Sequence, residues 1–356
     1  MREWLTTQSY SQVFVLCDTN TERDCLPWIE GFYDDYFVVK AGEQHKNIES
    51  TQAIWAWLLA RKADRNAVLL NLGGGVVGDM GGFAAATYKR GIDFVQIPTT
   101  LLAMIDASIG GKVGIDFGGI KNSVGVFCEP RVVFIAPEFL GTLPEREFRS
   151  GLAEVIKHEL IGIDEERGHV FARWHNLAEY RHLINKSLSN EDGDFTTTEY
   201  KELLLNTLYW ITENVAIKQE IVGQDPYEKG LRKVLNLGHT VGHAIESFSL
   251  TTDTPLLHGE SVALGLIVEL YLSHKKLGLK EKFYLDWTSI IRNNFPELPI
   301  LFRESDYETL WEFMLNDKKN NKGIVKCVLL ERIGNPAWDI ELSKDEFMEA
   351  IDVLMP

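Results

Sequence analysis

The first part of the chain alternates short apolar runs with amphipathic segments. Strand-like runs occupy 12–17, 36–39, 67–72, 93–97 and 131–135. Apolar residues at helical spacing fill 47–62, and a helix of small residues runs through 84–88. The run at 67–72 is apolar almost throughout, as expected for a strand covered on both faces. Strands that alternate with helices predict a mostly parallel sheet in an α/β domain.

From about residue 140 the pattern becomes helical. Thr142-Leu-Pro-Glu145 combines a capping Thr, an early Pro and a capping Glu, which is a strong helix start. Long helical patterns follow at 145–161, 199–223, 231–249, 259–277 and 305–316. A hairpin is predicted from 324–330 and 338–340, and an exposed loop from 185–194. We therefore expect two domains, an α/β domain at 1–145 and a mainly helical domain at 146–356.

Composition narrows the class of protein. The chain has 356 residues, of which 45% are apolar and 25% charged, as in a globular protein of about two domains. Its formal charge of −16 argues against a general nucleic-acid binder, and its apolar stretches are too short to cross a membrane. The N-terminus has no apolar leader, and the four cysteines are too sparse for a disulfide framework. We expect a cytoplasmic protein.

A glycine-rich turn follows the run at 67–72. Gly73, Gly75 and Gly78 satisfy the GxGxxG pattern, in which glycines let the backbone approach a pyrophosphate at a helix start. The next strand, however, ends in Pro98-Thr-Thr and not in the usual acidic ribose ligand. A turn that only packs a helix tightly on a sheet is the alternative. Asp79 is favoured by the helix dipole and could equally bind a cofactor hydroxyl.

A second group of residues suits a metal ion. His239 and His243 are four apart, which places both on one face of a predicted helix. His258 begins the next helix, and Glu154 lies on another with Lys157 three residues later. One carboxylate and two histidines form an ordinary catalytic zinc set. Spacing alone leaves open a pair of partly buried histidines bonded to the backbone.

Cationic residues accompany both groups. They are Lys112, Lys121 beside Asn122, Lys157, Lys218, Arg232 and the pair Lys318-Lys319, the first two in glycine-rich loops. Each alone reads as a solvated side chain. Together with the glycine turn and the histidines, they suit a small substrate with several negative charges.

Six stretches resemble the 3-dehydroquinate synthase family of the sugar phosphate cyclase superfamily. They are GGGVVGDMGGFAAATYKRG (73–91), PTTLLAMIDASIGGKVGID (98–116), IKNSVGVFCEP (120–130), TLPEREFRSGLAEVIK (142–157), LNLGHTVGHAIE (235–246) and LHGESVALG (257–265). The resemblance implies an N-terminal Rossmann-like NAD-binding domain and a mainly helical C-terminal metal-binding domain, the dehydroquinate synthase-like fold. Val113 departs from the family, which more often has Thr there, and the interval from His243 to His258 is slightly long.

The resemblance also implies roles for individual residues. Zinc, with cobalt as a substitute, would be bound by Glu154, His239 and His258. NAD would contact Asp18, Glu43, Lys46, Gly74, Gly75, Val76, Asp79, Thr99, Thr100, Lys112, Lys121, Thr142 and Leu143. Substrate contacts would be Asp106, Lys112, Lys121, Asn122, Lys157, Lys218, Arg232, Asn236, His243 and Lys318 or Lys319. Arg90 corresponds to an arginine that reaches the neighbouring subunit's site, which implies a homodimer.

The family reaction converts 3-deoxy-D-arabino-heptulosonate 7-phosphate to 3-dehydroquinate and phosphate in the shikimate route to aromatic amino acids. It proceeds by transient oxidation with NAD, phosphate elimination, re-reduction and intramolecular aldol closure. A cyclase of sedoheptulose 7-phosphate is a rival, but that substrate lacks the carboxylate, and the combination of Lys218, Arg232 and Asn236 argues against it. A metal-dependent polyol dehydrogenase of related fold is another. A catalytically inactive scaffold is disfavoured because every expected functional residue type is present.

Overall fold

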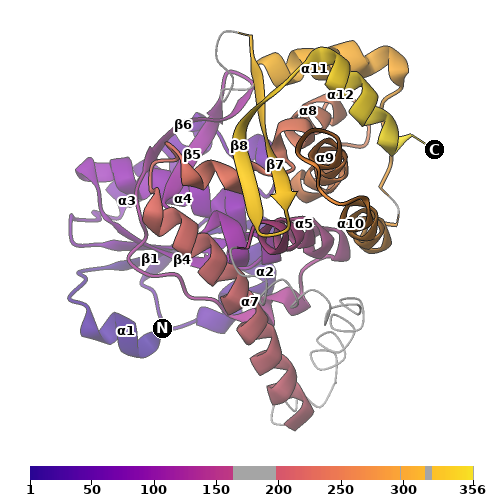
Figure 1. Cartoon of the computed structure of the whole chain (residues 1–356). Helices are drawn as coiled ribbons and strands as arrows, with labels where there is room; N and C mark the ends of the chain where they lie inside the picture. Colours follow the sequence, from indigo (N-terminus) through magenta and orange to yellow (C-terminus); the bar gives the residue numbers. More distant parts are fainter. Residues whose placement is uncertain (163–197, 297, 317–322, 356) are drawn as a thin grey trace. The chain divides into compact units, whose positions relative to one another are not determined.

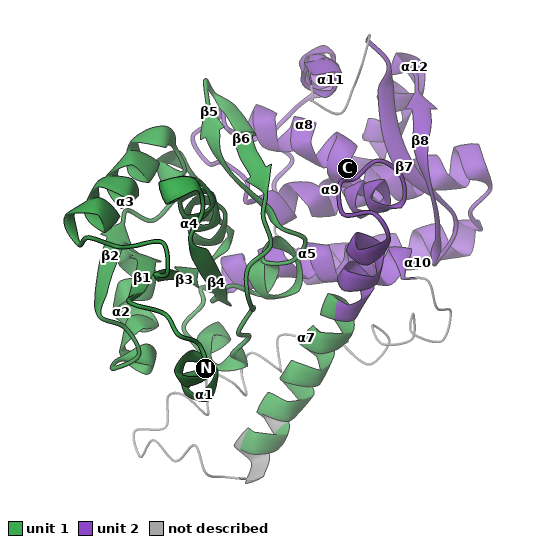
Figure 2. Ribbon diagram, turned by 90° about the vertical axis from the view of Figure 1, so that its left-hand side faces the viewer, with its two compact units in different colours: residues 1–144, 177–215 green, residues 145–176, 216–356 purple. Residues whose placement is uncertain are grey.

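The computed structural model describes residues 1–162, 198–296, 298–316 and 323–355. Its contacts form two compact units, coloured separately in Figure 2. Of the described residues, unit 1 holds 1–144 and 198–215, and unit 2 holds the rest. The sequence predicts one boundary, after residue 145. In the structure the chain also passes from unit 1 to unit 2 at residues 215–216, inside helix α7 (Thr198–Gln224).

Unit 1 is built on a four-stranded parallel sheet (Figure 1). Its strands are β1 (Val13–Asp18), β2 (Asp35–Val39), β3 (Val68–Gly73) and β4 (Asp93–Pro98). They lie in the order β2-β1-β3-β4, so the chain crosses back over β1 between β2 and β3. Four of the five strands predicted for the α/β domain are confirmed. All six residues of β3 are buried, as its apolar run predicted.

Helices complete unit 1. They are α1 (Arg2–Thr7), α2 (Thr19–Asp24), α3 (Ile48–Ala60) and α4 (Gly75–Thr87). A buried core joins Ile54 of α3 and Met80 of α4 to Leu16, Leu69 and Phe94 of the sheet. Helix α4 approaches the sheet closely because glycines face the strands.

The segment 131–135, predicted as a strand, is not one. It makes a single parallel bridge, Val133 to Gln96 of β4. The next bond in register would come from residue 132, but the N–H of Arg131 bonds to the carbonyl of Phe94 instead, at 2.9 Å. This slip directly after Pro130 ends the ladder after one bridge.

The glycine-rich loops predicted around Lys112 and Lys121 form a hairpin instead. Strands β5 (Lys112–Phe117) and β6 (Ile120–Phe127) pair antiparallel. The turn between them is Gly118-Gly119, and both residues have positive φ, at 62° and 79°. Two central residues of positive φ are what a tight hairpin turn requires, so the glycines close a hairpin.

Unit 2 is mainly helical. Its elements are α5 (Glu145–Ile161), the end of α7, α8 (His239–Ser249), α9 (His258–Leu272), α10 (Glu281–Asn294), α11 (Tyr307–Asn316), β7 (Val325–Arg332), β8 (Asn335–Leu342) and α12 (Lys344–Ile351). Helix α9 is the centre of the unit, since it packs against α5, α8, α10, α12 and β7. The predicted hairpin is confirmed as β7 and β8, whereas α10 and α12 were not predicted.

Two predicted helices have different ends from those expected. The helix expected at 259–277 is α9 followed by a π-helical turn, Ser273–Leu277. The helix expected at 231–249 is broken into a 3-10 helix, Leu231–Asn236, and α8. The break falls at Gly238, whose φ of 79° lies in the left-handed region that ends a right-handed helix. Consequently His239 is the first residue of α8.

Two further predictions concern the chain as a whole. Among the helices of the described residues, none is long and apolar enough to cross a membrane. The loop predicted at 185–194 lies outside the described residues.

We expect Gly81→Ala to destabilise unit 1. A Cβ at Gly81 would lie 2.1 Å from Asn71 Oδ1 and 2.8 Å from Leu16 Cδ2, both in the sheet beneath α4. Overpacking of this kind lowers the free energy of unfolding by about 1–3 kcal/mol, which urea unfolding measures. Gly223→Ala is the matched control, because that helical glycine has nothing within 4 Å of its would-be Cβ. Equal stability of the two variants would contradict the packing argument.

Candidate metal centre and nucleotide site

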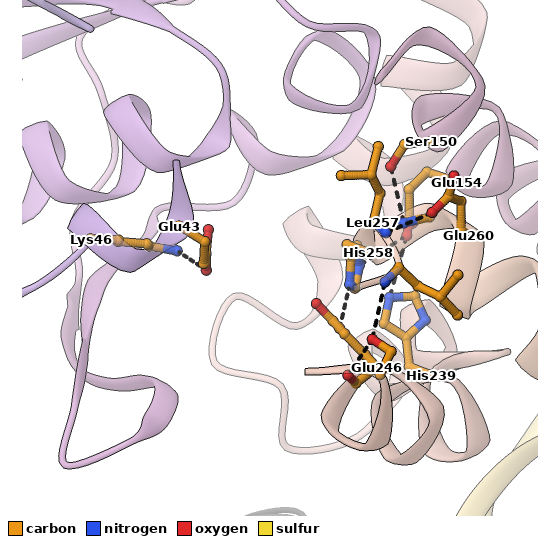
Figure 3. Close-up of polar contacts among 12 residues, drawn as sticks. Glu43, Lys46, Ser150, Glu154, His239, Glu246, Leu257, His258 and Glu260 are labelled. Carbon is orange, nitrogen blue, oxygen red and sulfur yellow. Dashed lines mark hydrogen bonds and ion pairs between the residues drawn. The ribbon is translucent and has the colours of Figure 1, made fainter. Parts of the chain in front are cut away.

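Three helices of unit 2 bring one carboxylate and two imidazoles together. Glu154 comes from α5, His239 from α8 and His258 from α9 (Figure 3). His239 Nε2 and His258 Nε2 each lie 3.4 Å from Glu154 Oε1. One donor atom from each residue lies within 4.8 Å of the other two. Two nitrogen ligands and one oxygen ligand at this separation fit a divalent zinc-like ion with an open position.

The start of α9 is fixed against α5. The N–H of Gly259 donates to Ser150 Oγ at 3.0 Å, one turn before Glu154 on α5. A Cβ at Gly259 would lie 1.8 Å from the carbonyl oxygen of Ser150, so only glycine permits this approach. The close crossing places His258, the neighbour of Gly259, beside Glu154.

The start of α8 is fixed by a carboxylate of α9. Glu269 is fully buried and accepts backbone N–H groups from Gly238 at 2.6 Å, Thr240 at 3.1 Å and Val241 at 3.3 Å. The first N–H groups of a helix have no partner within the helix, and a negative charge there is favoured by the dipole. Glu269 therefore caps the turn that carries His239.

Each histidine of the cluster is held through its second ring nitrogen. His239 Nδ1 lies 3.0 Å from the carbonyl oxygen of Leu237, and His258 Nδ1 lies 3.1 Å from Glu246 Oε2. Carbonyl and carboxylate oxygens only accept, so we assign the hydrogen to Nδ1 in both rings. Both Nε2 atoms then face Glu154, the arrangement that metal ligation needs.

The two histidines differ in charge state. Burial lowers the pKa of His239 below its usual range and outweighs the carboxylate of Glu154, so this ring is neutral. Burial acts in the same direction on His258, but the carboxylates of Glu246 and Glu154 outweigh it and raise its pKa to about 10. A cation bound at this site would replace the Nε2 proton of His258.

Lys157 and His243 border the cluster. The ammonium of Lys157 is ion-paired with the Glu154 carboxylate, and both side chains are only 2% exposed. The ring centroid of His243 lies 5.3 Å from that of His239 and 5.9 Å from that of His258. A second set of possible ligands, His243, Glu246 and His258, overlaps the first.

Arg232, Lys218 and Asn236 also belong to unit 2. The side chain of Arg232 is 1% exposed and donates through Nη1 to the carbonyl of Pro226. Asn236 Nδ2 donates to Glu228 Oε1 at 2.8 Å, and Lys218 is buried on α7. Neither Arg232 nor Lys218 is therefore the solvated side chain that a lone cation in the sequence suggests.

In unit 1 the candidate nucleotide residues gather at one edge of the sheet. Strands β1, β3 and β4 are parallel neighbours, so Asp18, the turn Gly73–Gly75 and Thr99 lie at their carboxyl ends. The N–H of Thr99 donates to the carbonyl of Gly73 at 3.0 Å. Gly74 caps α4 without a side chain, and a Cβ there would lie 2.9 Å from Thr100 Cγ2. The helix start is therefore bare backbone, as phosphate binding requires.

Lys46 is the buried cation of this edge. Its Nζ lies 2.7 Å from Asp79 Oδ2, 2.6 Å from Asn122 Oδ1 and 3.8 Å from Glu43 Oε1. Burial lowers its pKa, but the carboxylates of Asp79 and Glu43 outweigh that effect and raise it. The structure thus joins Glu43 and Lys46 to Asp79 and Asn122, which lie 33 and 76 residues after Lys46 in the sequence. Asp18 also has a structural duty, since it caps α2 by accepting the N–H groups of Asn20 and Thr21, both at 2.9 Å.

The remaining candidates are more scattered. Arg90, Lys112, Asn122 and Thr142 are exposed, whereas Gly75, Val76, Asp106 and Lys121 are half-buried and Leu143 is buried. Asp106 lies on a π-helical turn, Ala103–Ala107. Lys318 and its alternative Lys319 lie outside the described residues.

Comparison with known proteins places the chain in a family. Residues 36–150 match the family described as 3-dehydroquinate synthase N-terminal, and residues 151–320 match 3-dehydroquinate synthase C-terminal. The 3-dehydroquinate synthase of Parabacteroides distasonis is 40% identical over 356 residues, which cover 99% of this chain and 94% of that protein. The chain belongs to the 3-dehydroquinate synthase family.

Solved structures agree on the fold. A 2-deoxy-scyllo-inosose synthase complexed with carbaglucose-6-phosphate, NAD+ and Co2+ is 23% identical and superposes with a TM-score of 0.79, covering 96% of this chain and 90% of that one. A 2-epi-5-epi-valiolone synthase from Streptomyces hygroscopicus subsp. jinggangensis, with NAD+ and Zn2+ bound, is 24% identical with a TM-score of 0.78, covering 98% and 94%. At these identities the likeness shows the fold alone.

These findings confirm the family, the fold class and the enzymatic activity predicted from the sequence. The chain is an enzyme, a lyase with 3-dehydroquinate synthase activity in the shikimate pathway. The family implies a sugar-phosphate substrate, and structural relatives bind NAD+ with Zn2+ or Co2+. The roles of individual residues stay predictions.

Sequence reasoning missed two carboxylates that touch this cluster, Glu246 and Glu269. Glu246 had a signal, since it follows His239 and His243 at i+7 and i+3 on the same helix face. Glu269 lies inside an otherwise apolar stretch, Ser261–Leu272. An acid inside such a helix is expensive to bury unless it meets donors, so its presence was itself a signal.

We expect Glu269→Gln to weaken the start of α8. The amide keeps the shape but loses the charge that accepts three N–H groups, and hydrogen bonds to a charged group are worth about 1.5–3 kcal/mol. Urea unfolding of the metal-free protein should show a loss of this size, whereas the exposed Glu220→Gln should change it by less than about 0.5 kcal/mol. Unchanged stability of Glu269→Gln would rule out the capping role.

Proposed function

We propose that this enzyme uses NAD+ and one divalent metal ion to convert 3-deoxy-D-arabino-heptulosonate 7-phosphate to 3-dehydroquinate and phosphate. The observation that supports the metal most directly is the convergence of His239 Nε2 and His258 Nε2 on Glu154 Oε1. The bare helix start at Gly74 supports the dinucleotide. The family supplies the substrate class.

Glu154, His239 and His258 would hold the metal, zinc or cobalt in its place. When bound, the metal supplies Lewis acidity at a substrate hydroxyl, and NAD+ supplies a group that accepts a hydride and later gives it back. The chain's own residues then have to bind the substrate, orient it and carry protons.

We propose that Lys157 acts at the hydroxyl that is oxidised. Its ammonium is held against Glu154 in a buried setting, where a charge interacts more strongly than in water. His243 lies beside both metal-binding histidines, and we propose that it contacts the phosphate or carries its proton. Asp106 is proposed as a further substrate contact.

The two negatively charged ends of the substrate would have separate partners. Arg232 with Lys218 would bind the carboxylate, because a guanidinium matches a carboxylate in a two-point hydrogen bond. Lys112, Asn122, Asn236 and His243 would bind the phosphate. Lys121 and Lys318 are proposed substrate contacts on resemblance alone.

For NAD we propose backbone contacts at Gly74, Gly75 and Val76, where the start of α4 favours a phosphate. The group formed by Glu43, Lys46 and Asp79 would bind hydroxyl groups of the dinucleotide, with Asp18 at the end of β1. Further proposed contacts are Thr99, Thr100, Lys112, Lys121, Thr142 and Leu143.

We also propose a homodimer in which Arg90 reaches the neighbouring site. Arg90 is exposed and has a φ of 70°, next to Lys89 at 49°. Two successive non-glycine residues of positive φ are strained, and such strain persists where it serves a function. The cytoplasmic location stays a prediction from the sequence.

The first test measures phosphate and reduced NAD together. Purified enzyme with the heptulosonate phosphate and catalytic NAD+ should release phosphate without lasting accumulation of reduced NAD, and a chelator should abolish release. Sedoheptulose 7-phosphate, which lacks the carboxylate, should be a poor substrate. Steady accumulation of reduced NAD would instead indicate a polyol dehydrogenase, and preference for sedoheptulose 7-phosphate would indicate another cyclase.

The second test concerns the carboxylate contact. We expect Arg232→Ala to weaken substrate binding by about 1.5–3 kcal/mol, the scale of a hydrogen bond between charged groups, seen as a raised KM. Lys233→Ala is the matched control, because its ammonium pairs with Asp339 at 2.7 Å at a partly exposed position. Wild-type kinetics of Arg232→Ala would refute the carboxylate assignment.

A further inference from the structure

Glu246 lies on the same face of α8 as His239 and His243, at the end opposite His239. It is 5% exposed, and its Oε2 lies 3.1 Å from His258 Nδ1 (Figure 3). A carboxylate buried to this degree needs a donor, and His258 is one that it has. The contact links α8 to the first residue of α9.

The two proposed histidine ligands depend on different kinds of partner. His239 Nδ1 faces a backbone carbonyl, that of Leu237, which any sequence would supply. Both histidines begin their helices, but the side chain of His258 is 33% exposed against 11% for His239, so less of the protein surrounds its ring. Its ring therefore needs a side-chain acceptor to hold one orientation.

We propose that Glu246 is a positioning residue that fixes the tautomer and the ring plane of His258 for metal binding. By accepting the Nδ1 hydrogen, Glu246 keeps Nε2 directed at the space beside Glu154 Oε1, 3.4 Å away, where a bound cation would replace the Nε2 proton. Carboxylates that hold a ligating histidine in this way typically contribute 10–100-fold to metal affinity. This inference rests on the metal site of the proposed function.

A different role for Glu246 would be direct ligation. His243, Glu246 and His258 also bring one donor atom each within 4.8 Å of one another. Replacing a residue that binds the metal changes the absorption bands of the metal, whereas replacing a residue that only positions His258 leaves their positions unchanged.

The experiment compares zinc affinity, by competition with a chromophoric chelator, in the full-length enzyme and its variants. Glu246→Leu removes the acceptor at similar volume, and it should weaken zinc binding about 10–100-fold. Glu246→Gln keeps an acceptor oxygen without the charge, and it should fall between Glu246→Leu and the wild type. Affinity of Glu246→Leu equal to the wild type would overturn the proposal.

Ser249→Ala is the control for damage to the structure. Ser249 Oγ donates to the carbonyl of Glu246 at 2.7 Å and accepts the N–H of Leu256 at 3.1 Å. It therefore stabilises the connection between α8 and α9 without contacting the imidazole of His258. We expect Ser249→Ala to lower stability in urea yet to keep the zinc affinity. Equal losses of zinc affinity in Ser249→Ala and Glu246→Leu would overturn the proposal, since the effect would then be structural.

Absorption of the cobalt-loaded enzyme distinguishes positioning from ligation. Glu246→Gln should keep the band positions of the wild type, while Glu154→Gln should change them. A changed spectrum in Glu246→Gln together with an unchanged one in Glu154→Gln would make Glu246 a ligand and overturn the proposal. Failure of the proposed function itself is separate, because the wild type would then bind neither zinc nor cobalt.

Discussion

Unit 2 is organised around the burial of one carboxylate, that of Glu154. An isolated charge of this kind would cost several kcal/mol in a helical core, so it needs positive or polar partners on every side. Lys157 provides one from the same helix, and His239 and His258 provide two more from α8 and α9. Each partner can reach Glu154 only if its own helix lies close to it, and this requirement explains much of the packing of α5, α8 and α9.

The constraint on α8 and α9 is that their ends must meet at Glu154. Glu269 caps the start of α8, Glu246 joins α8 to the first residue of α9, and Ser150 joins that start to α5. Three buried acids thus have three separate tasks: Glu154 faces the imidazoles, Glu246 holds one of them and Glu269 holds the backbone. None is interchangeable with the others, because the donors that satisfy each are different.

Regular periodicity explains why most of the fold could be predicted. Strands β1 to β4 and helix α5 follow from apolar runs and from the helix-start pattern at 142–145, which depend only on neighbours in sequence. The hydroxyl of Thr142, predicted to cap α5, instead donates to the carbonyl of Phe139 at 3.3 Å at the end of the preceding 3-10 helix. The break at Gly238 and the slip at Arg131 depend on contacts with distant residues, Glu269 and Phe94, and no local pattern contains them. The family resemblance supplied the candidate cofactor contacts but omitted Glu246 and Glu269, which hold His258 and the start of α8 in place.

The charge of the whole chain is a poor guide to its site. The formal charge is −16, yet Lys46, Lys157, Lys218 and Arg232 are each no more than 5% exposed. Lys and Arg side chains are rarely buried unless they have hydrogen-bond acceptors or carboxylates as partners. Each buried Lys or Arg therefore indicates that several polar groups lie close to it. An acidic exterior disfavours loose binding of anions, while a buried cation interacts more strongly with a neighbouring charge than an exposed cation does. The selectivity that we propose for a small, doubly anionic substrate therefore rests on where the positive charges lie and not on how many there are.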